Sequence, residues 1–94
     1  MARQRLKLNI SNCIIYGDAK RLKDGKKPVK TLRRLTYILI KKDSFSGPTV
    51  EALYQKLYRC ELHGFFANSE EIENIIKDIC EVLMVDEKEL VINF

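Results

Sequence analysis

The alternation of apolar and polar residues near the start of the chain constrains its fold more than any other feature. Apolar side chains recur with a period of two that is broken only at Asn12, and they are Leu6, Leu8, Ile10, Ile14 and Tyr16. A period of two is typical of a strand with one buried face. We therefore predict an extended segment over residues 5–17.

A second extended segment is predicted over residues 31–42, which are rich in β-branched, aromatic and leucine side chains. Between the two segments lies Asp24-Gly25, a preferred pair for the two-residue turn of a β-hairpin. With this turn Ile10 faces Leu39, and the apolar faces of the two strands coincide. A longer loop over residues 18–30 is the alternative connection.

The second half of the chain has a helical period. Pro48 suits the first position of a helix, and the apolar stripe after it predicts a helix over residues 48–63. The sequence Asn68-Ser69-Glu70-Glu71 resembles a capping box, and the isoleucine-rich face that follows predicts a second helix over residues 69–84. Alternation over residues 89–94 predicts a short C-terminal strand.

Together these elements predict an α+β fold in the order β-β-α-α-β. A small antiparallel sheet, made of the long β-hairpin (residues 1–42) and the C-terminal strand, would carry the two α-helices (residues 48–84) packed on one face. A chain of 94 residues that is 46% hydrophobic has the size of a single domain, residues 1–94. The hairpin is longer than the helices, so its end is expected to project beyond the core.

Positive and negative charges are separated along the chain. Residues 1–42 hold 13 of the 17 Lys and Arg residues but two of the 13 acidic ones, a net charge of +11, whereas residues 43–94 have a net charge of −7. The projecting end of the hairpin contains a dense basic cluster: Lys20, Arg21, Lys23, Lys26, Lys27, Lys30, Arg33 and Arg34. Such a cluster attracts phosphates, so we expect a non-enzymatic protein that binds the backbone of DNA or RNA. Tyr16, at the base of the hairpin, suits packing on the sheet, with stacking on a base as the alternative.

The acidic second half of the chain supports a different function. Its carboxylates along the second helix, together with exposed aromatic rings, would suit a protein-binding adaptor or an inhibitor of the viral or mobile-element type, by general analogy. The candidate residues are Tyr58, Phe65, Asp78 and Glu81. At least one ring of the Phe65-Phe66 pair is expected to pack in the core. A free sheet edge also leaves a homodimer open.

Few residues suit catalysis or metal binding. His63 is the only histidine, and its predicted place at a helix end is explained by capping. With Cys13, Cys60 and Cys80 it reaches the ligand number of a zinc site, but the chain has only one short-spaced pair, Cys60 and His63, where structural zinc sites usually have two. We therefore expect no catalytic residues, no metal and no cofactor.

The cysteines and the apolar runs of the sequence bear on its cellular compartment. Three widely spaced cysteines do not predict a disulfide framework. No apolar run reaches the roughly 18 residues of a membrane span. These features predict a cytoplasmic, reducing location and no membrane partner.

Overall fold

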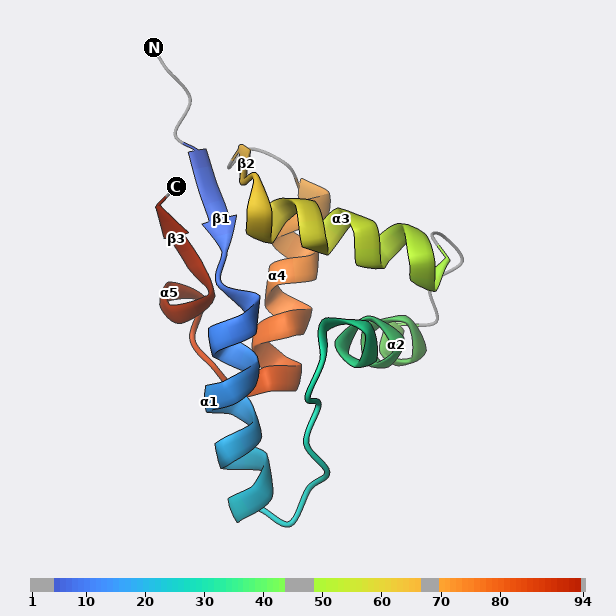
Figure 1. Cartoon of the computed structure of the whole chain (residues 1–94), viewed down its shortest axis with the longest axis vertical. Coiled ribbons are helices and arrows are strands. Elements are labelled where there is room, and N and C mark those ends of the chain that lie inside the picture. Colours follow the sequence, from blue (N-terminus) through green and yellow to red (C-terminus); the bar gives the residue numbers. More distant parts are fainter. Residues whose placement is uncertain (1–4, 44–48, 67–69, 94) are drawn as a thin grey trace.

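The computed structural model describes residues 5–43, 49–66 and 70–93, and most of these residues are helical (Figure 1). The elements in chain order are β1 (Arg5–Leu8), α1 (Ile10–Lys23), α2 (Leu32–Asp43), α3 (Val50–Leu62), β2 (Phe65–Phe66), α4 (Glu70–Leu83), α5 (Glu87–Leu90) and β3 (Val91–Asn93). The predicted order β-β-α-α-β is therefore wrong, because the long basic hairpin is replaced by two helices.

The first predicted strand is a helix over most of its length. Ile10, Cys13, Ile14 and Gly17 are the buried residues of α1, and they recur at spacings of three and four. Ile10 and Ile14 fit both a strand and a helical period, so they could not distinguish the two structures. Only β1 remains extended, with Leu8 as its buried residue.

The second predicted strand is also a helix. The buried side chains of this segment are Leu35, Thr36 and Leu39, which lie on one face of α2. Thr31 begins the helix, because its hydroxyl oxygen accepts a hydrogen bond from the backbone N–H of Arg34 at 3.2 Å. Burial of this face outweighs the β-propensity of the β-branched and aromatic residues.

Asp24-Gly25 ends a helix instead of turning a hairpin. The backbone N–H of Lys26 donates to the carbonyl of Arg21, and that of Gly25 donates to the carbonyl of Leu22. This pair of bonds is the Schellman motif, with Gly25 in the left-handed region at φ +74°. Both structures require a residue with positive φ at this position, which explains why the dipeptide predicted the wrong turn.

The two helices predicted in the second half are present as α3 and α4. Thr49 is the N-cap of α3, and its side chain accepts from the backbone N–H of Ala52. The predicted starts at Pro48 and Asn68-Ser69 lie outside the described residues. The helical period of the apolar residues was sufficient to predict these two helices.

The sheet has the strand order β2-β1-β3, and both pairs are antiparallel. Leu6 pairs with Phe65 on one side, and Leu8 pairs with Val91 on the other. Of the predicted strand over residues 89–94, Val91–Asn93 form β3, while Glu87–Leu90 form the short helix α5. Strand β3 therefore pairs with β1 near the start of the chain, beside which it lies in Figure 1.

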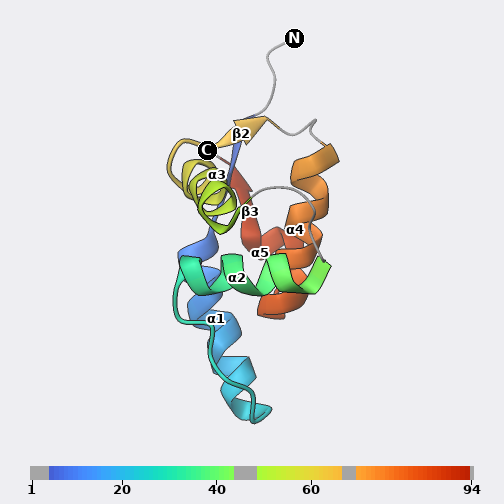
Figure 2. The same ribbon diagram turned by 90° about the vertical axis from the view of Figure 1, so that its right-hand side faces the viewer.

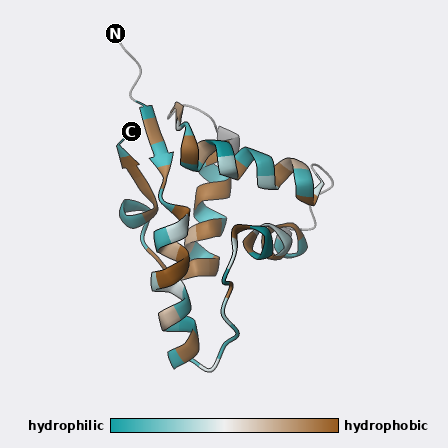
Figure 3. Cartoon of the chain, viewed as in Figure 1, coloured by the Kyte–Doolittle hydropathy of each residue, from teal (hydrophilic) through white to brown (hydrophobic). Residues whose placement is uncertain are grey.

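Helix α4 is the central packing element. It contacts both α1 and α2, while α2 packs on α3 and α3 packs on β1. Figure 2 shows α2 lying between α3 and the lower end of α1. Hydrophobic and hydrophilic residues alternate along α1, α3 and α4 in Figure 3, as expected of amphipathic helices around one core.

Gly17 allows α1 and α4 to touch. An ideal Cβ on Gly17 would lie 2.3 Å from the carbonyl oxygen of Leu83, well inside the contact distance of two such atoms. The backbones of the two helices thus meet at this point. Within the described part of the chain, no helix combines the length and the hydropathy needed to cross a bilayer.

Candidate functional site

The eight basic residues predicted to bind nucleic acid lie on a helix–connection–helix segment. They are Lys20, Arg21 and Lys23 in the last turn of α1, Lys26, Lys27 and Lys30 in the connection, and Arg33 and Arg34 in the first turn of α2. The end of α1 and this connection form the lower end of the molecule in Figures 1 and 2. The basic residues therefore stay together, although no hairpin holds them.

Two of the eight residues have a structural role. Lys20 Nζ donates to the carbonyl of Met84 at 2.7 Å, and Arg21 Nη1 donates to the carbonyl of Val82 at 3.0 Å. The Val82 carbonyl lies in the last turn of α4, where carbonyls lack intrahelical donors, and the Met84 carbonyl directly follows this helix end, where the dipole favours positive charge. Arg21 Nε also donates to the carbonyl of Lys27 at 2.8 Å, which ties the connection to this helix end.

The connection itself is held in a defined conformation. The two carboxylate oxygens of Asp18 accept from the backbone N–H groups of Val29 at 2.6 Å and Lys30 at 2.8 Å. The Val29 side chain is buried in the core. These contacts hold Lys30 at φ +70°, a backbone conformation that costs a non-glycine residue about 1 kcal/mol. The connection is thus a fixed platform for the basic side chains around it.

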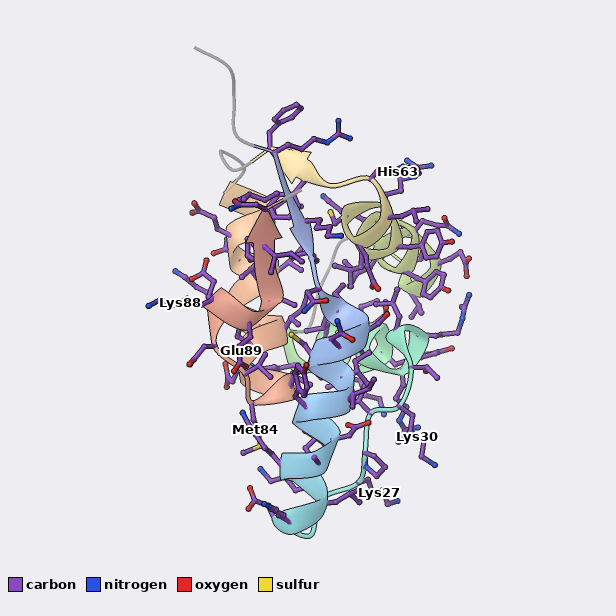
Figure 4. The ribbon with its side chains drawn as sticks, turned by 60° about the vertical axis from the view of Figure 1, so that its left-hand side comes forward. Lys27, Lys30, His63, Met84, Lys88 and Glu89 are labelled. Atoms are coloured by element: carbon purple, nitrogen blue, oxygen red, sulfur yellow. The ribbon has the colours of Figure 1, made fainter. Side chains whose placement is uncertain are left out.

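Arg33 pairs with Glu51 of α3, and the five remaining basic side chains are exposed around this platform: Lys23, Lys26, Lys27, Lys30 and Arg34. We call them the basic surface. Among the side chains that the structure describes, none of the five has a carboxylate within ion-pair distance. Lys27, Lys30 and Arg34 line a shallow depression of about 350 Å³, and the first two extend from the connection in Figure 4. The basic surface is therefore open to an anionic ligand.

The start of α2 increases the positive potential of this region. Its first turn holds Arg33 and Arg34 and no acidic residue, whereas the helix dipole favours carboxylates there. Arg33 is compensated by α3: it pairs with Glu51 at 3.0 Å, and its guanidinium lies 4.6 Å from the ring centroid of Tyr54. The hydrogen bond from Arg33 lowers the pKa of Glu51. Arg34 has no ion-pair partner among the described side chains, and it adds its charge to the positive end of the helix.

Tyr16 does not pack on a sheet. It lies on α1 with 55% of its surface exposed, on the same side of the helix as Asn12 and Lys20. Ser11 and Asp18, which bond to α3 and to the connection, lie on the other side of α1, so Tyr16 faces away from both. The prediction of sheet packing for Tyr16 is therefore wrong.

The residues proposed for protein binding lie on separate elements. Tyr58 is exposed on α3, and Phe65 in β2 is half-buried against the core, as expected for one ring of its pair. Asp78 and Glu81 lie on α4, where Glu81 pairs with Lys42 of α2 at 2.6 Å. Part of the acidic face thus serves to hold α2 against α4.

The thiols and the histidine do not form a reactive group. Cys60 is buried and its pKa is raised by burial, whereas His63 is exposed at the end of α3. The thiol of Cys13 is also buried and donates to the carbonyl of Glu89 at 3.4 Å. In the part of the chain that the structure describes, no three metal-binding side chains converge.

Cys80 is expected to resist alkylation although it is only half-buried. Burial, reinforced by the charge of Glu87, raises its pKa to about 11, so that about 0.1% of it is thiolate at pH 8. Native protein treated with iodoacetamide at pH 8 should react at this thiol on the order of 100-fold more slowly than an ordinary cysteine, and peptide mass spectrometry measures that rate. The rate should increase about ten-fold per pH unit up to pH 10, because the thiolate is the nucleophile.

The control for this prediction is the same reaction in urea, where all three cysteines should react at ordinary rates. Rapid modification of Cys80 in the native protein at pH 8 would contradict the raised pKa.

A second depression, of about 370 Å³, lies beside α3. We call it the α3 pocket; its lining includes Leu8, Ser11, Leu32, Tyr54, Tyr58, Glu61 and Leu62. The sequence did not single out this site, since its walls come from β1, α1, α2 and α3. The available signal was the spacing of Tyr54 and Tyr58, which places both rings on one side of a helix.

No protein-family model, curated protein or solved structure matches this chain. The charge and shape of the basic surface and of the α3 pocket are therefore the features that indicate a function.

Proposed function

We propose that this chain is a non-enzymatic protein that binds nucleic acid, through phosphate contacts made by the basic surface. The observation that carries the proposal is the uncompensated positive charge at the start of α2. Arg34 occupies the first turn against the preference of the helix dipole, and Lys27 and Lys30 line the same depression. Departures from local rules that are grouped at one place are typical of binding sites.

A polyanion is the ligand that relieves the repulsion between these basic side chains. Five cations held on a fixed platform repel one another, and a phosphate backbone neutralises them while it releases its own condensed counterions. The exposed backbone N–H groups of a helix start also attract phosphate oxygens. The three free thiols suit a reducing compartment, so we place this activity in the cytoplasm.

Fluorescence anisotropy with labelled single-stranded DNA, single-stranded RNA and duplexes of the same length tests the proposal. We expect binding near 50 mM salt that weakens steeply as salt is added. If about four phosphates are neutralised, the slope of log K against log salt should be about −3 to −4, because each contributes about −0.7 to −0.9.

A matched titration with an uncharged nucleic-acid analogue, such as a peptide nucleic acid, provides the control. Absence of binding to every charged oligonucleotide at 50 mM salt would reject the proposed function. A complex whose affinity does not change with salt would also reject it.

A further inference from the structure

The α3 pocket lies beside the basic surface, and the two meet at the start of α2. Leu32 lines the α3 pocket, while its neighbour Thr31 lines the depression beneath the basic surface. Because adjacent residues line the two depressions, a ligand whose phosphates lie on the basic surface also lies next to the α3 pocket. This continuity connects the pocket to the proposed function, on which the following inference rests.

One wall of the α3 pocket is aromatic and already ordered. Tyr54 and Tyr58 are stacked, with their ring centroids 6.3 Å apart and their planes inclined by 21°. The guanidinium of Arg33 lies over Tyr54, and its ion pair with Glu51 fixes it there. Tyr58 is the outer member of this series and is 47% exposed. Ordered rings of this kind are the surfaces on which nucleic-acid-binding proteins stack bases.

The rest of the lining offers polar groups beside apolar ones. The hydroxyl of Ser11 donates to one carboxylate oxygen of Glu61, which leaves the other oxygen to accept from an amino group. Leu32 and Leu62 supply apolar surface. A flat aromatic ligand with amino groups on its edge matches this combination, and the volume lies at the lower end of the range for small-molecule sites.

We propose that the α3 pocket receives an unpaired base of a single-stranded nucleic acid whose phosphates lie on the basic surface. In a duplex both faces of each base are covered by neighbouring base pairs, so a base can stack on Tyr58 only when it is unpaired. The preferred ligand is therefore single-stranded, and Tyr58 is the main stacking residue.

The test compares two DNA ligands of about 12 nucleotides, a length within the site sizes of single-strand-binding folds. One is an ordinary mixed-sequence strand, and the other is an abasic strand with the same number of phosphates. We expect wild-type protein to bind the ordinary strand on the order of 10-fold more tightly, with equal salt slopes for both strands. A ribo-oligonucleotide of the same sequence then shows whether the 2′-hydroxyl adds to the affinity.

Substitutions assign this difference to the pocket. Y58A should weaken binding to the ordinary strand on the order of 10-fold and leave the abasic strand unaffected, whereas Y58F should bind both strands as wild type does. Y16A is the matched control, because Tyr16 is exposed to a similar extent but lines neither depression. Circular dichroism confirms that the variants fold, as expected for exposed positions.

The outcomes separate this inference from the proposed function. If wild-type protein binds both strands equally, or if Y58A behaves like Y16A, phosphate binding stands and the base pocket is rejected. If wild-type protein binds neither strand, the base pocket is rejected, and if it also binds none of the other charged oligonucleotides at 50 mM salt, the proposed function is rejected with it.

Discussion

Reversal of charge at Lys27, Lys30 and Arg34 is expected to weaken nucleic-acid binding on the order of 100-fold or more at 100 mM salt. These three side chains line one depression, and none of them has a carboxylate partner among the described residues. A hydrogen bond to a charged group contributes about 1.5 kcal/mol or more, so the loss of three contacts, with added repulsion, exceeds two orders of magnitude. The salt slope should fall by about 2 to 3. Anisotropy titration of the K27E/K30E/R34E variant measures both quantities.

The matched control is K41E/K77E/K88E, which makes the same change in net charge at exposed positions on α2, α4 and α5. Lys88 lies on the opposite side of the view from Lys27 and Lys30 in Figure 4. The control should lose far less affinity, because only long-range attraction is reduced. Equal losses in the two variants would show that binding depends on net charge and not on the basic surface.

Replacement of Gly17 by alanine is expected to destabilise the fold by about 2 to 3 kcal/mol, a large part of the roughly 5 to 10 kcal/mol of a domain this size. The new methyl group would lie 2.3 Å from the Leu83 carbonyl oxygen, a backbone atom that cannot rotate away. Helices α1 and α4 must therefore separate, at a cost above the roughly 1 kcal/mol gained in helix propensity. Urea denaturation followed by circular dichroism measures the change, and valine should have a larger effect than alanine.

Gly25→Ala provides the comparison for this prediction. A methyl group there meets nothing within 4 Å, so the cost is limited to the φ of +74° and should be about 1 kcal/mol. If Gly17→Ala left the free energy of unfolding unchanged, the close contact between α1 and α4 would be wrong.

Sequence patterns predicted the second half of the fold better than the first. For α3 and α4, the caps and the apolar stripe favoured the same structure. In the first half, Ile10 and Ile14 fit two periods, and Asp24-Gly25 suits both a hairpin turn and a helix end. Only Cys13 and Gly17 favour the helix, and they are buried because other elements pack against them. Patterns that fit two structures cannot be resolved without knowledge of what packs against them.

The candidate site, too, could be predicted from the sequence only where its residues are close together in the chain. The basic residues were found because they are neighbours in the sequence, and neighbours remain close in any fold. The capping roles of Lys20 and Arg21 depend on carbonyls at Met84 and Val82, more than 60 positions away. The α3 pocket likewise joins Ser11 to Glu61, across 50 positions. Such contacts exist only once the chain has folded, and no local pattern predicts them.

The position of β1 at the centre of the sheet has a kinetic consequence. Its partners are residues 65–66 and 91–93, so each strand pair closes a loop that contains most of the chain. Loop closure costs entropy before any pairing is gained, whereas an isolated helix forms within about a microsecond. The helices should therefore form early and the sheet late. Until residues 91–93 are in place, β1 has an open edge that another chain can occupy, and this is the step at which a partly folded molecule is most prone to aggregate.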